Sequence, residues 1–211
     1  MLKTKMAVLI SGGGTNLQAL IDFAAEGKLT SGELALVVSN NADAYGLFRA
    51  EKAGIKTAVV CADKSLEPKE RQAKFEEELQ ELLFREKIEM IVLAGFMRIL
   101  SADFVAKWPQ RIINVHPSLI PSFCGDGFYG LRVHEAALSY GVKVTGATVH
   151  FVNEITDGGT IILQKAVEIR EGDTAELLQK RVMEEAEWKI LPEAAELVAN
   201  QIRREKQKDE L

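Results

Sequence analysis

Asn114 and His116 stand two residues apart at the end of a short apolar run. In an extended strand, alternate side chains point to the same face, so the amide and the imidazole lie side by side. The amide can donate a hydrogen bond to an oxyanion while the imidazolium donates a proton, which suits general acid catalysis. A histidine that only hydrogen-bonds a neighbouring loop explains the same residues, so both interpretations stay open.

A glycine-rich loop, Ser-Gly-Gly-Gly-Thr-Asn at residues 11–16, separates an apolar run from a helical pattern. Backbone amides at such a helix start can bind an anion. The dinucleotide fingerprint fails, because Leu17 stands where a small residue is required and no acidic residue follows the next apolar run. No Gly-Lys-Ser/Thr motif is present either. The loop therefore favours a phosphate over a plain tight turn, without identifying a nucleotide.

Asp157 precedes two glycines, a pattern that usually means a turn. Asp157 belongs to the candidate site only if its carboxylate faces His116, which spacing alone cannot show. Arg98, after a very apolar run, is either a solvated charge or a contact for an anion. The other histidines and the two cysteines lack metal-ligand spacing, so we expect no metal site; they are His134, His150, Cys61 and Cys124.

The elements that must position these residues alternate between short apolar runs and amphipathic stretches, which is typical of βα units with a parallel sheet. Five strands are expected before residue 116, at 6–10, 34–38, 56–60, 88–94 and 111–115. The aperiodic segment 117–130 predicts a long loop, followed by a helix over 131–140 and strands over 142–152 and 161–169. Asp173, with Glu176 three residues on, predicts the start of a long C-terminal helix with a capping box.

Composition is that of one globular domain: 211 residues, with 26 basic and 31 acidic side chains giving a net charge of −5. This balance disfavours a general nucleic-acid or membrane-surface binder. Two cysteines, no long apolar run and no signal-peptide pattern predict a cytoplasmic protein. The final Lys-Asp-Glu-Leu therefore reads as a coincidence rather than a retention signal. From the residues alone, we expect an α/β domain that binds an anionic small molecule.

Five segments in this order and spacing resemble the phosphoribosylglycinamide formyltransferase family of folate-dependent enzymes. They are residues 10–17, 38–40, 93–100, 114–119 and 157–159, and the resemblance spans roughly residues 5–199. It implies a single-domain, Rossmann-like formyltransferase fold with a mostly parallel sheet and a more irregular C-terminal half. It also implies transfer of a formyl group from 10-formyltetrahydrofolate to the amine of 5′-phosphoribosylglycinamide, in purine synthesis. No metal is required.

The resemblance also carries site residues onto this sequence. The catalytic trio corresponds to Asn114, His116 and Asp157. The ribonucleotide would be bound by Gly13, Gly14, Thr15, Asn16 and Glu187. The folate would be bound by Arg71, Met97, Arg98, Ile99, Leu100 and Asn114. A carboxylate at Asp157 beside His116 would help to keep that imidazole charged at neutral pH.

Two departures from the family pattern stand out. Trp188 follows the ribonucleotide-binding glutamate where the family often has histidine, and the loop over residues 122–130 is more elaborate than the commonest version. We expect one domain over residues 1–200, with a phosphate-binding half at about 5–100 and a catalytic half at about 101–200. A charged tail over residues 201–211 would follow.

Several other functions fit the sequence less well. The related methionyl-tRNA formyltransferases and formyltetrahydrofolate hydrolases carry further domains for which this length leaves no room. Leu17 and Asn40 argue against a nicotinamide-dependent oxidoreductase, because they stand where the dinucleotide fingerprint requires a small residue and an acidic residue. A non-catalytic anion-binding module would leave the trio without a purpose. The expected partners are the two small substrates, with no nucleic acid and no membrane, for a monomer or a homodimer.

Overall fold

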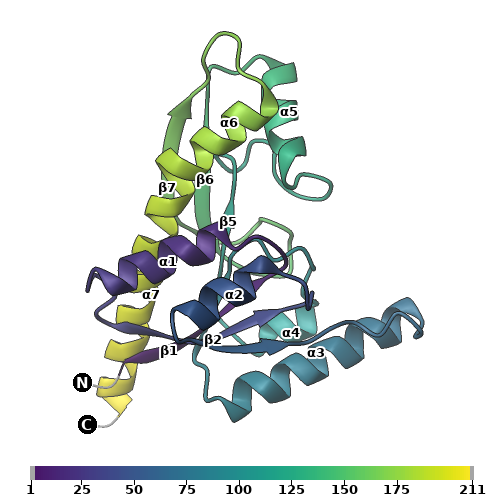
Figure 1. Ribbon diagram of the computed structural model, residues 1–211, viewed down its shortest axis with the longest axis vertical. Coiled ribbons are helices and arrows are strands. Elements are labelled where there is room, and N and C mark those ends of the chain that lie inside the picture. The colour runs from purple at the N-terminus through teal and green to yellow at the C-terminus, as the bar shows by residue number, and fades with distance from the viewer. Residues whose placement is uncertain (1–2, 210–211) are drawn as a thin grey trace.

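A seven-stranded sheet forms the centre of the protein, in the order β3-β2-β1-β4-β5-β6-β7. The computed structural model describes residues 3–209 (Figure 1). Five strands are parallel: β1 (Thr4–Ile10), β2 (Gly32–Ser39), β3 (Lys56–Val59), β4 (Met90–Leu93) and β5 (Ile112–His116). The last two, β6 (Val144–Phe151) and β7 (Ile161–Glu168), are antiparallel. The expected α/β class and mostly parallel sheet are confirmed.

Helices cover both faces of the sheet, because its strands alternate apolar side chains between two separate cores. Met6, Val8 and Ile10 of β1 pack in the core shared with α1 (Thr15–Ala25), α2 (Tyr45–Lys52) and the C-terminal helices. Ala7 and Leu9 face the other core, shared with α3 (Pro68–Arg85) and α4 (Ala102–Ala106). Figure 1 shows α5 (Leu131–Tyr140) beside α6 (Ala175–Val182), away from α3.

The C-terminal helix differs from the sequence expectation in two respects. It consists of α6 (Ala175–Val182), a π-helical turn η1 (Met183–Glu187) and α7 (Trp188–Asp209). The expected capping box at Asp173 is wrong: Thr174 is the N-cap, and its hydroxyl accepts the Leu177 N–H at 3.3 Å. Asp173 instead accepts two 2.6 Å hydrogen bonds from Arg181, and a strong acceptor committed to a guanidinium is not available to cap the helix.

The order of the strands brings three loops to one edge of the sheet. The chain builds outward from β1 to β3, then returns to add β4 on the other side of β1. In such sheets, ligands bind beyond the carboxyl ends of the strands, where the order reverses. The glycine loop follows β1, residues 94–101 follow β4, and His116 ends β5, so all three lie at this edge.

None of the helices in the described part of the chain combines the length and apolar character needed to cross a bilayer. Helix α7 continues to Asp209, through most of the charged segment after residue 200. Glu210 and Leu211, which complete the Lys-Asp-Glu-Leu sequence, lie outside the described residues.

Candidate active site

The structure brings His116 and Asp157 together, which the sequence spacing left open. Nδ1 of His116 lies 3.3 Å from Oδ2 of Asp157, and both side chains are buried. Nε2 of His116 faces the backbone carbonyl of Phe123 at 2.9 Å. The imidazole is therefore held between a carboxylate from the loop after β6 and a carbonyl from the long loop after β5.

Burial has the largest effect on the charge of His116. It lowers the pKa of this imidazole below its ordinary value, and nearby His150 lowers it further, while Asp157 and the Phe123 carbonyl oppose the decrease. Asp157 thus favours the charged form of His116, as expected, but burial favours the neutral form more strongly. A neutral imidazole at neutral pH can accept a proton before it donates one. Buried His134, whose pKa burial and then His116 lower to about 4, is neutral as well.

Asp157 owes its position to a strained turn. Its backbone has φ of 55°, in the left-handed region that aspartate tolerates better than most residues. Two residues on, a Cβ at Gly159 would lie 1.7 Å from the Phe151 carbonyl oxygen, so only glycine fits. Burial alone would raise the pKa of Asp157, but contacts with His150, His116 and the Gly125 N–H together lower it. The group therefore remains a carboxylate.

His150 also belongs to this group, although its position in the sequence predicts no role for it other than that of a metal ligand. Strand β6 pairs with β5 so that His150 lies opposite Asn114. Its Nδ1 faces the Phe151 carbonyl at 2.8 Å, so this nitrogen carries the hydrogen. Its Nε2 lies 3.3 Å from Nδ2 of Asn114 and 3.6 Å from Oδ1 of Asp157. His150 thus accepts from the Asn114 amide and lies beside the Asp157 carboxylate, and the alternation of β6 was the signal for it.

The glycine loop is shaped by α2. Gly14 has φ of 71°, and a Cβ there would lie 2.7 Å from Cα of Gly46, so the two glycines permit close contact between loop and helix. The Gly46 N–H donates to the Gly12 carbonyl at 3.0 Å, and Nε of Arg49 donates to the Gly13 carbonyl at 2.9 Å. A cavity of about 280 Å³ lies against the loop, between residues 11–16 and residues 94–97. The backbone amides of the glycine loop can therefore bind a small anionic group in this cavity.

Asn16 and Glu187 meet beside this loop. Nδ2 of Asn16 donates to Oε2 of Glu187 at 2.7 Å, and both side chains are more than nine-tenths buried. The π-helical turn η1 ends at Glu187, and such turns often occur at functional sites. Burial raises the pKa of Glu187, although the Asn16 amide opposes this. Oδ1 of Asn16 is buried without a partner among the described residues, so it can accept a hydrogen bond from a ligand.

The segment after β4 presents apolar side chains beside the same edge. Met97 and Ile99 are 58% and 68% exposed, whereas Leu100 is buried. The Met97 N–H donates to Oγ of Ser11 at 2.8 Å, which ties this segment to the glycine loop. Arg98 turns back onto α3, with its guanidinium 4.4 Å from the Phe75 ring centre.

Arg71 does not join this group of residues in the structure. Its guanidinium donates to three backbone carbonyls of the loop before α3, those of Asp63, Lys64 and Leu66. With three donors used locally, the arginine serves the loop rather than the edge of the sheet where His116 lies.

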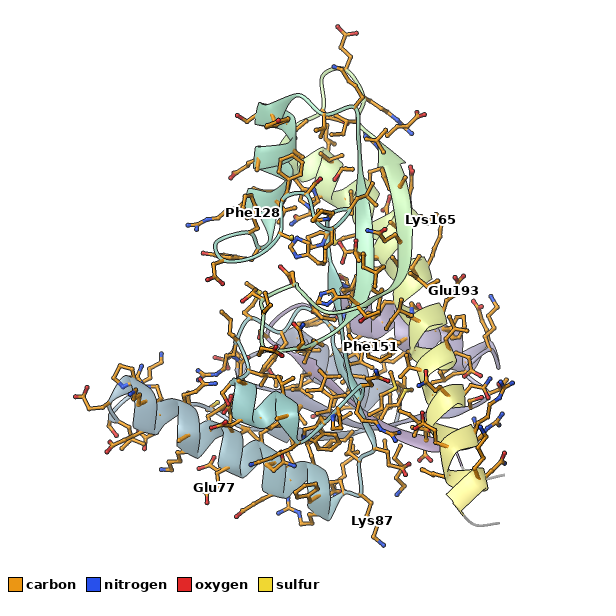
Figure 2. The ribbon with its side chains drawn as sticks, turned by 180° about the vertical axis from the view of Figure 1, so that it is seen from behind. Glu77, Lys87, Phe128, Phe151, Lys165 and Glu193 are labelled. Atoms are coloured by element: carbon orange, nitrogen blue, oxygen red, sulfur yellow. The ribbon has the colours of Figure 1, made fainter. Side chains whose placement is uncertain are left out.

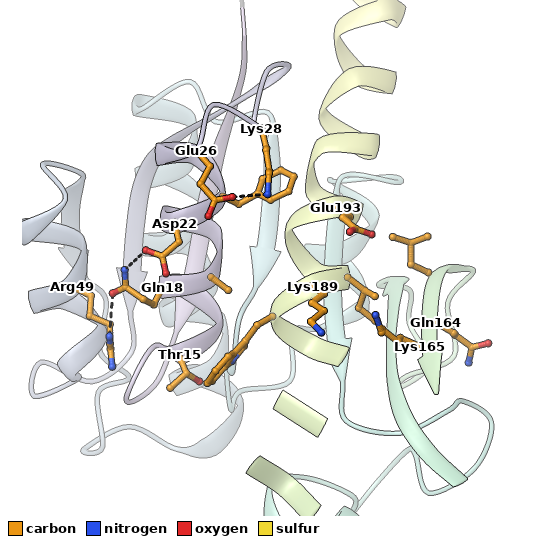
Figure 3. Close-up of a pocket in the computed structure, with 15 residues that line it drawn as sticks. Thr15, Gln18, Asp22, Glu26, Lys28, Arg49, Gln164, Lys165, Lys189 and Glu193 are labelled. Atoms are coloured by element: carbon orange, nitrogen blue, oxygen red, sulfur yellow. Dashed lines mark hydrogen bonds and ion pairs between the residues drawn. The ribbon is translucent and has the colours of Figure 1, made fainter. Parts of the chain in front are cut away.

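A larger cavity, of about 660 Å³, opens between α1, β7 and α7 (Figure 3). Thr15 at its rim also borders the glycine loop, and Trp188 and Lys189 of α7 line it. Its charges are of both signs and include the pair Lys28–Glu26. Asn114, His116 and Asp157 do not line it, so the reactive groups face a different space. Figure 2 shows Phe151, which follows His150, near the middle of the molecule and Phe128 on the long loop.

Within residues 3–209, no group of three or more histidine, cysteine or acidic side chains is arranged to hold a metal ion. The arrangement offers an acid–base histidine, an amide donor and an anion-binding loop at one edge of a sheet.

Comparison with known proteins identifies relatives over most of the chain. The sequence pattern of the formyl transferase family matches residues 4–195. The trifunctional purine biosynthetic protein adenosine-3 of Bos taurus is 48% identical over 198 residues, which are 94% of this chain and 18% of that protein. The chain thus spans under a fifth of the length of this relative. The phosphoribosylglycinamide formyltransferase of Haemophilus influenzae is 42% identical over 188 residues, covering 89% of this chain and 84% of that protein.

Solved structures agree with these relatives. Glycinamide ribonucleotide transformylase 1 from Symbiobacterium toebii superposes with a TM-score of 0.84 at 43% identity, covering 94% of this chain and 89% of that one. Phosphoribosylglycinamide formyltransferase from Brucella melitensis has a TM-score of 0.82 at 41% identity, with 94% and 96% covered.

Proposed function

Since this chain belongs to the formyl transferase family, we propose that it transfers the formyl group of 10-formyltetrahydrofolate to the amine of 5′-phosphoribosylglycinamide. The products are the formylated ribonucleotide and tetrahydrofolate, in de novo purine synthesis. The observation that carries the proposal is the His116–Asp157 pair, 3.3 Å apart, at the sheet edge that also holds Asn114 and the glycine loop. Proteins named for this activity are 42% identical and closely similar in structure.

The ribonucleotide is bound by the glycine loop and the Asn16–Glu187 pair. Backbone amides of Gly13, Gly14 and Thr15 would hold the phosphate at the start of α1, where the helix dipole favours negative charge. The free Oδ1 of Asn16 and the carboxylate of Glu187 would accept hydrogen bonds from the sugar or the amine. This binding places the amine toward His116.

The folate lies against the segment after β4. The exposed side chains of Met97 and Ile99 offer apolar contact to its ring system, supported by buried Leu100. Arg98 contributes positive charge from behind this segment, stacked on Phe75. Asn114 would contact the formyl group. Arg71 would contribute positive charge from beside the loop before α3, to whose carbonyls its Nε and Nη2 donate.

The proposed reaction depends on which of these groups can accept a proton and which can donate one. The amine nitrogen attacks the formyl carbon, and the π electron pair of the C=O bond moves to the oxygen. Asn114 stabilises the resulting oxyanion through its side-chain N–H. Neutral His116 accepts the proton that the amine loses, and it then donates this proton to the folate nitrogen as the old C–N bond breaks. Asp157 stabilises the intermediate imidazolium. Substrate binding has to displace the Phe123 carbonyl, which occupies Nε2 of His116 in the described state.

One assay tests the proposal and separates it from its alternatives. The protein is mixed with 10-formyltetrahydrofolate, with and without the ribonucleotide, and release of tetrahydrofolate is followed. Release that depends on the ribonucleotide supports the transferase. Release without it indicates a formyltetrahydrofolate hydrolase, and no release indicates a non-catalytic anion-binding module.

The His116→Ala variant completes this test. Because the imidazole carries the proton and the phosphate is held elsewhere, turnover should fall by a factor of about 10²–10⁴ while ribonucleotide affinity is retained. Equilibrium binding and initial rates measure the two effects. Turnover near that of the wild type would contradict the role of His116.

The proposal includes a cytoplasmic site of action, as a monomer or homodimer with small-molecule partners. Cys61 and Cys124 are both free thiols in the structure, which is typical of a reducing compartment. Fractionation of cells that produce the tagged protein measures the location, and light scattering of the purified protein measures the oligomeric state.

A further inference from the structure

The segment from Gly95 to Leu100 depends on side chains for its shape. No backbone-to-backbone hydrogen bond within residues 3–209 involves these six residues. Their backbone is held instead by Ser11, whose hydroxyl accepts the Met97 N–H, and by Gln72, whose amide donates to the Ile99 carbonyl at 3.0 Å. A segment without backbone partners has the conformation that these few contacts impose.

Gln72 makes two contacts with the segment at once. Its Oε1 accepts from Nη2 of Arg98 at 2.5 Å, while its Nε2 donates to the Ile99 carbonyl. A side-chain amide has an acceptor and a donor at fixed separation, so it sets the guanidinium and the next carbonyl relative to one another. A carboxylate or an ammonium could supply only half of this pattern.

Helix α3 fixes Gln72 itself. Nε2 also donates to Oε1 of buried Glu76, one turn later, at 2.6 Å. Glu76 in turn accepts the N–H of Ser101 at 2.6 Å and its hydroxyl at 2.5 Å, which fixes the far end of the segment. The ring of Phe75 lies beneath Arg98. Polar contacts from Gln72 and Glu76, one helical turn apart, thus connect α3 to the segment over residues 98–101.

We propose that Gln72 is a positioning residue for the folate substrate, acting through Arg98 and Ile99 rather than by touching the ligand. It keeps the Arg98 cation over Phe75 and the exposed Met97 and Ile99 side chains turned toward the edge of the sheet. The neighbouring Arg71 makes no such contact with the segment: its Nε and Nη2 donate to the loop before α3. The inference rests on the proposed function, in which residues 97–100 bind the folate.

The test compares Gln72→Met, which keeps the volume and removes both contacts, with Gln72→Glu. Removing a hydrogen bond to a charged group should raise KM for 10-formyltetrahydrofolate about tenfold in the methionine variant, with KM for the ribonucleotide unchanged. The glutamate variant should have a still higher KM for 10-formyltetrahydrofolate, because a second carboxylate would face Glu76 at the 2.6 Å contact. Lys69→Met, an exposed change on the same helix, is the control and should behave as the wild type.

The outcomes distinguish a failure of the inference about Gln72 from a failure of the proposed function. An unchanged folate KM in both variants, with an active wild type, would overturn the role of Gln72. Equal increases in both substrate KM values would overturn it too, since that is the effect of general loss of structure. A wild type that releases no tetrahydrofolate would contradict the proposed function instead. Thermal unfolding of each variant confirms that the protein compared is folded.

Discussion

At the scale of single residues, the site depends on how buried polar atoms are paired. His116, Asp157, His150 and Asn114 form one connected group, with separations of 3.3–3.6 Å between neighbouring polar atoms. In a buried environment each contact is strong, and each unpaired atom is costly. Changes to single members should therefore affect the chemistry more than the binding of substrates.

Asp157→Asn tests the influence of the carboxylate on His116. The carboxylate stabilises the imidazolium and so raises the pKa of His116 against the effect of burial. Removal of the negative charge lowers that pKa further, so the acidic limb of the kcat/KM profile should move to lower pH. Turnover should also fall, because the imidazolium intermediate loses its counter-charge. A pH–rate series on both proteins measures this, and an unchanged profile with full activity would remove Asp157 from the mechanism.

His150→Phe tests whether that histidine orients Asn114. Phenylalanine keeps a ring in the buried position but cannot accept from Nδ2 of Asn114. We expect kcat to fall about 10–100-fold, because the amide is no longer aimed at the oxyanion. The KM for the ribonucleotide should stay near that of the wild type, since the glycine loop is untouched. His150→Gln, which can still pair with an amide, should recover part of the loss; equal turnover in all three proteins would contradict the orienting role.

At the scale of elements, the turn after β6 carries Asp157, the proposed partner of His116 in catalysis. The turn has no freedom at Gly159, where any side chain would collide with the Phe151 backbone. Strand β6 is itself fixed by its antiparallel pairing with β5. The register of two strands thus determines the position of Asp157, and the turn cannot move independently of them.

Gly159→Ala should therefore lower stability and turnover together. The new Cβ would lie 1.7 Å from a backbone oxygen, so the turn must shift and carry Asp157 away from His116. We expect a loss of about 1–3 kcal/mol in the free energy of unfolding, with a larger proportional loss of kcat. Urea unfolding and initial rates measure the two effects. The exposed neighbour change Glu154→Ala is the matched control, and a Gly159→Ala protein as active as this control would refute the steric explanation.

At the scale of the whole molecule, α7 holds the two halves of the sheet together. It packs in the same core as β1, α1 and β6, and Oγ1 of Thr4 donates to the Ala199 carbonyl at 2.9 Å. Glu196 accepts hydrogen bonds from the Ser31 N–H and from the Thr30 hydroxyl, just before β2. Figure 1 shows α7 running down one side of the molecule. The position of Glu187 depends on this packing.

Two leucines of α7 offer a matched comparison. Leu191 is fully buried in the main core, whereas Leu197, less than two turns later, is 53% exposed. Leu191→Ala should cost about 2–5 kcal/mol of unfolding free energy, because it leaves a cavity. That corresponds to a decrease in Tm of about 4–20 °C for a domain of this size. Leu197→Ala should change stability by no more than about 0.5 kcal/mol. Calorimetry measures both; similar decreases would show that α7 does not anchor the core as described.

Much of this organisation was predictable because it is encoded locally. The apolar runs ending at Ile10 and Leu93 specify buried strands, and the glycines after Ile10 specify a tight turn into a helix. The helix over residues 131–140 was predicted with its observed bounds. The capping of the C-terminal helix was not, because Asp173 pairs with Arg181, a partner eight residues away. The π-helical turn before Trp188 carries no local signal that distinguishes it from an ordinary helix.

By itself, the sequence determined the α/β class, the glycine loop before a helix and the chemical character of Asn114 and His116, since each follows from neighbours along the chain. Only the tertiary structure decided what these groups face. Asp157 reaches His116, and His150 reaches Asn114, because β6 pairs with β5 in one register across 36 residues of chain. Burial, which also exists only in the folded chain, lowers the pKa of His116 against the carboxylate beside it. Pairing between distant segments and exclusion of water are properties of the whole fold, so spacing along the chain cannot report them.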